Sequence, residues 1–400
     1  MAPSEARIVI VGAGPVGLAL AFRLHVFGVP CLVLDENPVA PDDLRASTFH
    51  PPTLDMLDEY GLAASLLAQG LPAPTWQIRM HETGARAVFD LGVIADKTRH
   101  PYRLQCEQFR LVRLLEERLA TSGVVEIRRG ARVEGATQGE TGVEVSGVGA
   151  DGAAFRERGL ILVGADGAHS IVRRCMDLRL EGQTYPETTV LATTPFRFED
   201  HLEGLSNVNY VWRAGGTYSL LRLRDKWRCS LYPDPDETIE GMLQPQVIEK
   251  HLQRIVPRAE SYEVVDLRPY RVHMRIVEDY RRGRMVLAGD AAHINSPSGG
   301  MGMNGGVHDA FNLSDKLKQI WDGASLDLLD LYTRQRRPIA EDEILGQADR
   351  NRARMQERNQ DRRAELLAEL QRVAGDRDLA RARLLQSSMI TGLERSRSIQ

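Results

Sequence analysis

The chain has 400 residues, a hydrophobic fraction of 42%, a charged fraction of 26% and a formal net charge of −4. This balance is typical of a globular protein and argues against a disordered chain or one that coats nucleic acid. The length exceeds one ordinary core, so two lobes that share a cleft are expected. Four separated cysteines without a CxxC pair predict neither a disulfide framework nor a metal site, and they fit a cytoplasmic setting.

The first part of the chain alternates between strand and helix patterns. Apolar runs predict strands over residues 7–11 and 31–35, with a helix over 15–27 between them. Alternation over 76–91 then predicts a strand pair, and leucine spacing predicts a helix over 109–120. Glycines interrupt the first apolar run, which therefore does not read as a secretory signal. Nowhere do about 18 apolar residues follow one another, so no membrane span is expected.

A glycine motif separates the first predicted strand from the first predicted helix: Gly12-Ala13-Gly14-Pro15-Val16-Gly17. Glycines here permit a tight turn, close approach of a pyrophosphate and close packing of the helix on the strand. Free N–H groups at the start of the helix favour a phosphate. Asp35 ends the second strand, where its carboxylate can accept both hydroxyls of an adenosine ribose. The motif predicts a dinucleotide site but does not distinguish NAD from FAD.

Residues from about 180 to 282 have a different sequence pattern from the part of the chain before them. Strand patterns over 207–213, 217–223 and 227–232, separated by turn residues, predict a small antiparallel sheet. The candidate substrate contacts on this sheet are Tyr210, Trp212, Tyr218, Arg222 and Tyr232. Side chains alternate between the two faces of a strand, so only one set can face a cleft. Arg222 could recognise a carboxylate or simply face solvent, and the tyrosines could be packing residues.

Two further motifs return to the pattern of strand, glycine-rich turn and helix. The first is Gly164-Ala165-Asp166-Gly167, which follows an apolar strand. The second is Gly289-Asp290-Ala291-Ala292-His293, followed by Pro297, Gly299, Gly300, Gly302, Met303, Asn304 and a helix that starts near Gly305 or Gly306. Beyond about residue 334 the chain is rich in Arg and Glu, which predicts solvated helices. Arg350, Arg352 and Arg354 are interpreted there as a solvated face rather than a nucleic-acid site.

The three motifs occur in one order over residues 7–340 and together resemble those of the flavoprotein aromatic hydroxylases, the class A flavin monooxygenases with the para-hydroxybenzoate hydroxylase type of fold. The resemblance implies an α/β fold with a discontinuous Rossmann-like FAD-binding lobe, an antiparallel β-sheet substrate lobe and C-terminal helices. The implied boundaries are 1–75, 104–178 and 283–340 for FAD, 76–103 and 179–282 for substrate, and 341–400 for the helical tail.

The same resemblance implies which residues contact FAD. They are Gly12, Gly14, Pro15, Gly17, Asp35, Arg45, Gln108, Asp166, Gly289, Asp290, Pro297, Gly300, Gly302, Met303 and Asn304. Asp290 would bind the ribityl and pyrophosphate region, and Asp166 would support the pyrophosphate side and the docking of NADH or NADPH. Arg45 could instead form a surface ion pair, and Gln108 could be a helix cap. A flat flavin ring can approach the bare glycine backbone, where helix N–H groups would face its pyrimidine edge.

The chemistry implied by the resemblance is ring hydroxylation. NADH or NADPH would reduce the flavin, O₂ would add at its C4a carbon, and the resulting hydroperoxide would oxygenate a small phenolic or N-heteroaromatic substrate. Pro297 and His50 are the candidates beside the reacting ring, although His50 could be a loop or capping residue. The alternatives are a reductase or quinone-type hydroxylase with the same fold, or a non-catalytic FAD-binding carrier. The protein is expected to be a monomer or homodimer that binds no nucleic acid.

Overall fold

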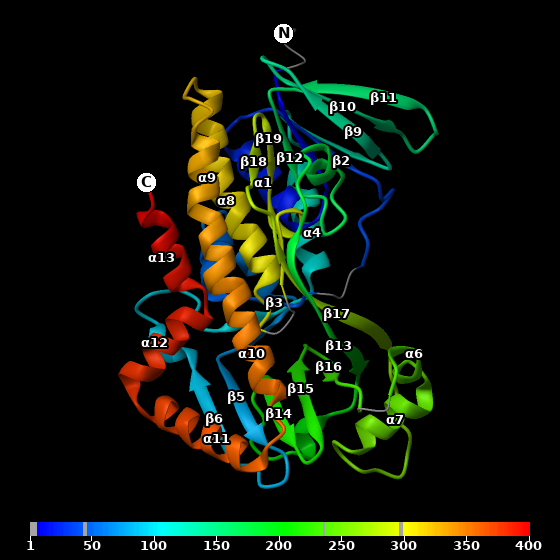
Figure 1. Cartoon of the computed structure of the whole chain (residues 1–400), viewed down its shortest axis with the longest axis vertical. Helices are drawn as coiled ribbons and strands as arrows, with labels where there is room; N and C mark the ends of the chain where they lie inside the picture. Colours follow the sequence, from blue (N-terminus) through cyan, green and yellow to red (C-terminus); the bar gives the residue numbers. More distant parts are fainter. Residues whose placement is uncertain (1–5, 43–45, 235–236, 296–298) are drawn as a thin grey trace.

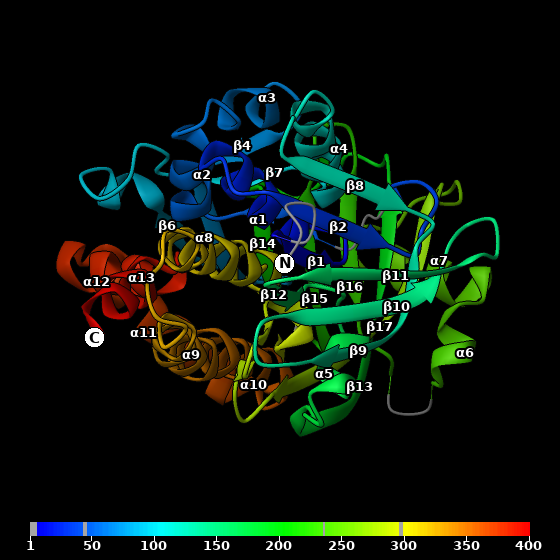
Figure 2. The ribbon, with the colours of Figure 1, turned by 90° about the horizontal axis from the view of Figure 1, so that it is seen from above.

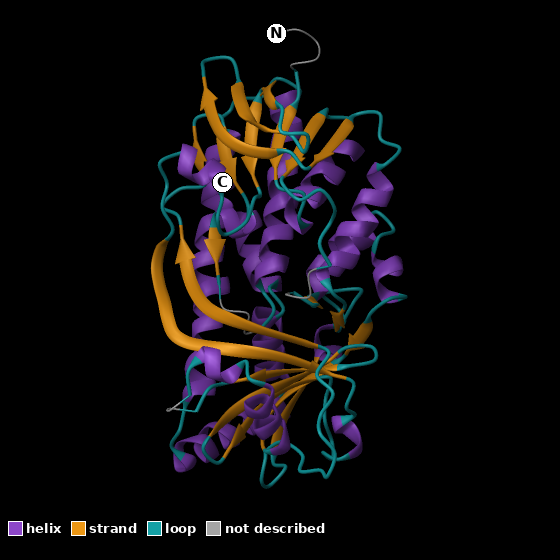
Figure 3. Cartoon of the chain, turned by 90° about the vertical axis from the view of Figure 1, so that its right-hand side faces the viewer, coloured by secondary structure: helices purple, strands orange, loops and turns teal. Residues whose placement is uncertain are grey.

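The computed structural model describes residues 6–42, 46–234, 237–295 and 299–400, and its strands gather into two large sheets near opposite ends of the molecule (Figures 1 and 3). The first sheet is mostly parallel and has six strands. In spatial order these are β18 (Arg281–Arg282), β19 (Met285–Leu287), β12 (Ile161–Gly164), β1 (Ile8–Val11), β2 (Cys31–Asp35) and β8 (Val125–Arg129).

The centre of this sheet explains the apolar run at the start of the sequence. β1 is paired on both sides in parallel, with Ile8 opposite Ile161 of β12 and Cys31 of β2. All its residues are buried, as expected for a parallel strand covered on both faces. Helix α1 (Pro15–Val26) packs against α4 (Gln108–Leu119) and against α8 (Gly302–Trp321). A three-stranded sheet of β9 (Arg132–Gln138), β10 (Val143–Val148) and β11 (Ala154–Gly159) lies nearby (Figure 2). The predicted strand, helix and strand over 7–35 are confirmed.

The second sheet has eight strands and is larger than the small sheet predicted. Its spatial order is β20 (His293–Ile294), β17 (Asp266–Ile276), β13 (Glu181–Thr194), β16 (Trp227–Leu231), β15 (Gly216–Arg222), β14 (Val208–Arg213), β5 (Thr75–Met80) and β6 (Arg86–Asp90). The three predicted strands are confirmed as its middle. β5, from much earlier in the chain, adds to β14 in parallel, with Trp76 opposite Val208.

Long helices connect the two ends of the molecule. α8 packs against α1 and begins at Gly302, about one turn earlier than predicted. After α9 (Leu328–Ile339) a π-helical segment (Ala340–Leu345) leads into α10 (Gly346–Gln356), which reaches the second sheet (Figure 1). Helices α11 (Gln360–Gly375), α12 (Arg377–Ser387) and α13 (Ile390–Ser398) follow, and α11 packs on β6 (Figure 1).

The remaining elements are short. They are β3 (Thr48–Phe49), α2 (Pro51–Asp58), α3 (Ala63–Leu67), β4 (Leu71–Ala73), β7 (Arg103–Gln105), α5 (Ile171–Cys175), α6 (Ile239–Met242) and α7 (Pro245–Gln253), with 3-10 turns at Leu91–Ile94, Phe198–Asp200 and Gly289–Ala291. The largest hydrophobic core surrounds the first sheet, and two smaller ones flank the second. Of the helices in the described ranges, none combines the length and apolar character needed to cross a bilayer.

Candidate active site

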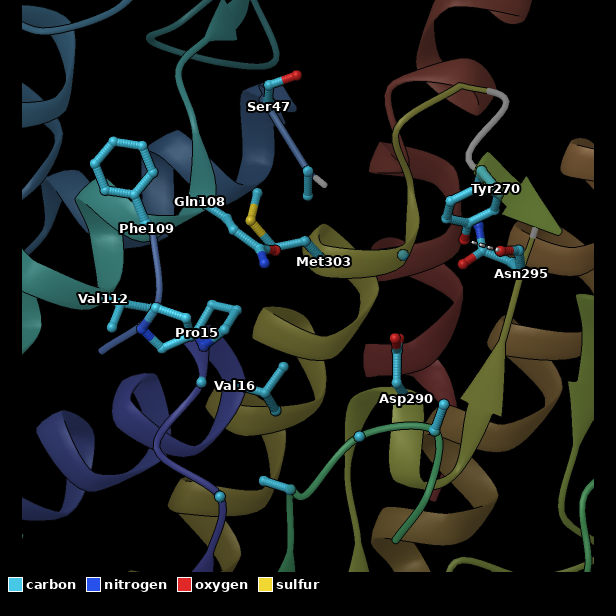
Figure 4. Close-up of a pocket in the computed structure, with 18 of the residues that line it drawn as sticks. Pro15, Val16, Ser47, Gln108, Phe109, Val112, Tyr270, Asp290, Asn295 and Met303 are labelled. Carbon is cyan, nitrogen blue, oxygen red and sulfur yellow. Dashed lines mark hydrogen bonds between the residues drawn. The ribbon is translucent and has the colours of Figure 1, made fainter. Parts of the chain in front are cut away.

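One cavity of about 1020 Å³ runs from the β1–α1 turn to the second sheet. Figure 4 shows side chains from several elements around it, including Pro15 of α1, Gln108 of α4 and Met303 of α8, with Tyr270 and Asn295 on another side. The predicted cofactor residues that line this cavity are Gly12, Gly14, Pro15, Asp35, Gln108, Asp166, Asp290, Gly300, Gly302 and Met303. Arg45 and Pro297 lie outside the described residues.

The glycines of the β1–α1 turn have different roles. Gly12 has a φ of +105°, and a Cβ there would lie 2.3 Å from the carbonyl oxygen of Ala165. Gly17 lies behind the cavity wall, where a Cβ would lie 1.9 Å from the carbonyl oxygen of Gly12, so it serves helix packing. A Cβ on Gly14 would meet no protein atom within 4 Å. Neither the backbone nor the packing of the protein requires glycine at position 14, which suggests that this space is for a ligand.

The same turn offers donors to an anion and an acceptor to hydroxyl groups. Helix α1 has no side-chain cap and no acidic residue in its first turn, so its first N–H groups lack side-chain acceptors at the cavity. Asp35 accepts a hydrogen bond from the N–H of Ala13 (2.7 Å) and pairs with Arg129 (3.1 Å). Arg129, which the sequence analysis did not single out, also lines the cavity and positions this carboxylate.

Asp166 and Asp290 reach the cavity from the second and third motifs. Asp166 accepts hydrogen bonds from the N–H groups of Ile171 and Val172, so part of its role is to hold the start of α5. Asp290 is exposed, and its carboxylate stands on the turn below the cavity in Figure 4. Gly289 lies behind this turn rather than on the cavity surface, because a Cβ there would lie 2.9 Å from the side chain of Val16.

A buried charged group supports the Gly289–Asp290 turn. Asp309 of α8 pairs with His293 (2.8 Å) and Arg336 (2.6 Å) and accepts a hydrogen bond from the N–H of Gly289 (3.1 Å). Burial alone would raise the pKa of Asp309, but the charges of Arg336 and His293 outweigh this effect and lower it to about 2. The three side chains are at most 1% exposed. His293 therefore acts in the structure of the turn.

Hydrogen bonds on the side away from the cavity connect the loop from Gly299 to Met303 with β3. The side-chain amide of Asn304 donates to the carbonyls of Thr48 (2.8 Å) and Gly300 (2.7 Å), and its oxygen accepts from the N–H of His50 (2.9 Å). Asn304 is fully buried and does not line the cavity, so its predicted direct contact with the cofactor is not supported. Its position instead holds the glycine backbone at the cavity surface.

His50 also lies behind this loop, not beside the cavity. Its side chain is fully buried, and Nε2 donates to the carbonyl oxygen of Gly299 (2.8 Å). Burial, together with the charge of Arg103, lowers the pKa of His50 to about 3. A histidine that is neutral at physiological pH and does not line the cavity does not fit the predicted position beside the reacting ring, where it could have acted as a base. We expect it to position the loop.

A substitution of His50 separates these two roles. In His50→Gln the side-chain amide can still donate to Gly299, so we expect the unfolding free energy to fall by about 1–2 kcal/mol. The pH profile of turnover should keep its shape, because His50 does not titrate between pH 5 and 8. Unfolding in urea and turnover measured across that pH range check both expectations. Loss of an ionisation from the profile would restore the role as a base.

The second sheet brings together only part of the predicted substrate set. Tyr210 and Tyr232 line the cavity. Tyr218 is on the opposite face of β15, where its hydroxyl contacts His81 (2.8 Å). Arg222 also points away and pairs with Glu199 (3.2 Å). Trp212 is on the same face of β14 as Tyr210 but lies beyond the cavity, where its Nε1 donates to the carbonyl oxygen of Arg354 (3.0 Å).

Several cavity residues were missed in the sequence. Arg103 of β7 and Arg228 of β16 line the cavity although each is only 4% exposed. Arg228 could have been predicted, because it lies an even number of residues before Tyr232 in the same predicted strand and therefore faces the same side of the sheet. The interpretation of Arg352 and Arg354 as a solvated face is wrong, because α10 closes one side of the site: Arg352 lines the main cavity and Arg354 lines a smaller cavity beside it.

Comparisons with known proteins agree with this geometry. The FAD binding domain family matches residues 5–345. The 6-hydroxy-3-succinoylpyridine 3-monooxygenase of Pseudomonas putida is 34% identical over 333 residues, which cover 83% of this chain and 84% of that enzyme. The para-nitrophenol 4-monooxygenase of Pseudomonas sp. strain WBC-3 is 34% identical, with 83% of each chain covered.

Solved structures extend the similarity to the whole fold. The p-nitrophenol 4-monooxygenase from Pseudomonas putida DLL-E4 superposes with a TM-score of 0.90 at 32% identity, covering 97% of this chain and 98% of that one. Aklavinone-11 hydroxylase, solved with FAD and aklavinone, gives a TM-score of 0.78 at 28% identity, covering 89% of this chain and 70% of that one. This chain belongs to the FAD binding domain family, and within it to the flavin-dependent aromatic monooxygenases.

Proposed function

We propose that the protein hydroxylates a small phenolic or N-heteroaromatic ring, using FAD, O₂ and either NADH or NADPH. The observation that carries the proposal is the single cavity that connects the open space at Gly14 to Tyr210 and Arg228 of the second sheet. Relatives whose names specify a hydroxysuccinoylpyridine, para-nitrophenol and pentachlorophenol as substrates support the ring class.

The residues of the cavity fit FAD. The open space at Gly14 and the start of α1 would take the pyrophosphate, Asp35 the ribose, and the backbone from Gly300 to Met303 the flat ring. When bound, FAD would supply the redox chemistry, accepting electrons from NADH or NADPH and activating O₂. Segments 1–75, 104–178 and 283–340 would form the FAD lobe, and 76–103 with 179–282 the substrate lobe.

The contribution of the protein to the substrate ring would be electrostatic. Arg103 and Arg228 are buried cations on the cavity wall, and cations in a poorly solvated site favour the ionised form of a phenol. A phenolate is a stronger nucleophile at its ring carbons than a phenol. The tyrosines Tyr210, Tyr232 and Tyr270 on the same wall would orient the ring and exclude water.

This arrangement predicts a change in phenol ionisation. In Arg228→Gln we expect the apparent pKa of bound para-nitrophenol to rise by about 1 relative to the unaltered protein, because one nearby positive charge is lost. The visible absorbance of the phenolate, followed in a pH titration of the complex, measures this directly. Arg156→Gln, at a side chain that is 78% exposed, is the control and should leave the pKa unchanged. An unchanged pKa in Arg228→Gln would show that this arginine does not set the ionisation.

The function itself is tested with the purified protein. Its visible spectrum should show a bound flavin, and phenols or pyridines should stimulate the oxidation of NADH or NADPH with formation of an oxygenated product detected by mass spectrometry. Stimulated oxidation that yields only reduced substrate would indicate a reductase, and a prenylated quinone precursor as the one productive substrate would indicate a quinone-type hydroxylase. Bound FAD without any stimulated turnover would indicate a carrier.

A further inference from the structure

A second cavity of about 210 Å³ adjoins the main one. The two share lining residues, among them Arg103 and Tyr210, so the smaller cavity lies directly beside the main one. β5 and β14 form one side of this space, and α10 and α12 close the other. We call it the arginine chamber, because four arginines line it: Arg103, Arg350, Arg354 and Arg383.

The described wall of the chamber holds no carboxylate that offsets these charges. Among the described residues that line it, none is Asp or Glu. Glu369 of α11 is the acid whose charge acts on Arg354 and Arg383, but its side chain is exposed and no ion pair within 4 Å joins it to either arginine in the described structure. Arg103 is buried, Arg354 and Arg383 are half-buried, and Arg350 is exposed. Charges withdrawn from water are normally paired, so the like charges of the three less exposed arginines are costly without an anion.

Within the described residues, the contacts that these arginines make are with neutral groups. Arg103 is hydrogen-bonded to Tyr210 and lies 5.5 Å from the ring centre of Trp76. Arg383 lies 5.2 Å from the ring centre of Phe89, on the same pair of stacked rings. In the described structure the Nε atoms of Arg103 and Arg383 are buried and have no hydrogen-bond partner.

Two arginines of α10 complete the chamber, and both contact side-chain amides. Arg350 donates to Gln347 (3.2 Å), and Arg354 makes a long contact with Asn351 (3.4 Å). Burial lowers the pKa of Arg354, and the charge of Arg350 lowers it further. Burial likewise lowers the pKa of Arg383 to about 10, with Arg354 contributing. The arginines thus repel one another, and an incoming anion would relieve that repulsion.

We infer that the arginine chamber binds a carboxylate carried by the substrate, while the ring to be hydroxylated stays in the main cavity beyond Arg103 and Tyr210. The inference rests on the proposed function for the position of the ring. Guanidinium groups bind carboxylates with paired, charge-assisted hydrogen bonds. Trp76, Ile78 and Met355 add apolar wall to the chamber, which suits a short alkyl linker between ring and acid better than it suits a fully hydrated inorganic anion.

The experiment compares acids with their amides. A series of 4-hydroxyphenyl carboxylic acids with alkyl linkers of increasing length is titrated into the FAD-loaded protein, each beside its primary amide, and binding is followed by the change in the flavin spectrum. The acid with the best linker should bind about 10- to 100-fold more tightly than its amide. Acids and amides of equal affinity throughout the series would overturn the inference.

Variants locate the preference. Arg350→Gln and Arg383→Gln should each reduce the ratio of acid to amide affinity about tenfold, with the affinity for the amide unchanged. The side chain of Arg350 is exposed, so its loss should not affect folding. Arg377→Gln changes an exposed arginine of the same helix as Arg383 and should leave the ratio as it was. A ratio that survives in Arg350→Gln and Arg383→Gln together would overturn the inference, even if one variant alone proved unstable.

Two further measurements separate the possible failures. Inorganic phosphate that competes as well as the best acid would show that the chamber takes any small oxyanion, and this would overturn the assignment to a carboxylate. Binding is also measured by thermal shift on the protein as purified. If a protein without FAD or turnover still bound acids more tightly than amides, the proposed function would be refuted but the anion site would stand. Normal turnover without a preference for acids would refute only the assignment of the arginine chamber.

Discussion

Gly14→Asp is expected to abolish FAD binding without unfolding the protein. The new side chain would enter the space at the β1–α1 turn in which a Cβ meets no protein atom within 4 Å, so folding should be undisturbed. Its carboxylate would stand where the pyrophosphate is proposed to lie. Two like charges about 4 Å apart in a partly buried site cost about 4 kcal/mol, which corresponds to roughly 1000-fold in affinity.

The measurement is the flavin content of the purified variant together with its melting temperature. Gly123→Asp is the matched control, because Gly123 is exposed and also has no protein atom near its Cβ position. The control should retain both FAD and stability. A Gly14→Asp protein that keeps its flavin absorbance would show that the pyrophosphate lies elsewhere. A variant that loses its flavin and also melts early would show that the turn is needed for folding.

The part of the site near the β1–α1 turn could be predicted because its determinants are local. A buried parallel strand needs an uninterrupted apolar run, a tight turn before a helix needs glycine, and Asp35 follows at the end of the next strand. Each requirement is satisfied within one short segment of sequence. The structure keeps these residues together for the same reason, with Gly12 against Ala165 and Asp35 on the N–H of Ala13.

The start of α8 shows how one local signal can have two meanings. The glycines from Gly299 onward favoured an extended loop as far as Gly305 or Gly306, yet the helix already begins at Gly302. Gly306 is required for close packing, since a Cβ there would lie 2.5 Å from the side chain of Val16 in α1. Sequence alone does not reveal that the glycine serves contact between two helices rather than a turn.

The substrate end could be predicted only in part because it depends on long-range geometry. Alternation along β14 and β15 restricts the candidates to two sets, but only the position of the cavity selects between them, and it selects Tyr210 over Tyr218. A position on the correct face of the strand is still not enough to place a side chain in the cavity, because α10 covers Trp212. Arg103 and Arg354 come from a short strand and a late helix that no sequence pattern connects to the sheet.

Asp309→Asn is expected to destabilise the protein by about 3–5 kcal/mol at neutral pH. The substitution keeps the size of the side chain but leaves the Arg336 guanidinium buried without its carboxylate, which is the costly way to break a buried pair. Urea unfolding measures the loss. Asp322→Asn changes a half-exposed carboxylate at the end of the same helix, paired with Lys318, and should alter stability by no more than about 0.5 kcal/mol.

The pH dependence of unfolding then tests whether the carboxylate is the source of that stability. The pKa of Asp309 is about 2 in the folded protein, below its ordinary value of 3.8. Between these values the unfolded chain binds more protons than the folded one, so stability should fall as the pH decreases through this window and should be fully present above it. From the pKa difference the loss amounts to about 2–3 kcal/mol. The Asn variant lacks the ionisable group and should lack this component; the same acid dependence in both proteins would show that Asp309 does not contribute as a buried anion.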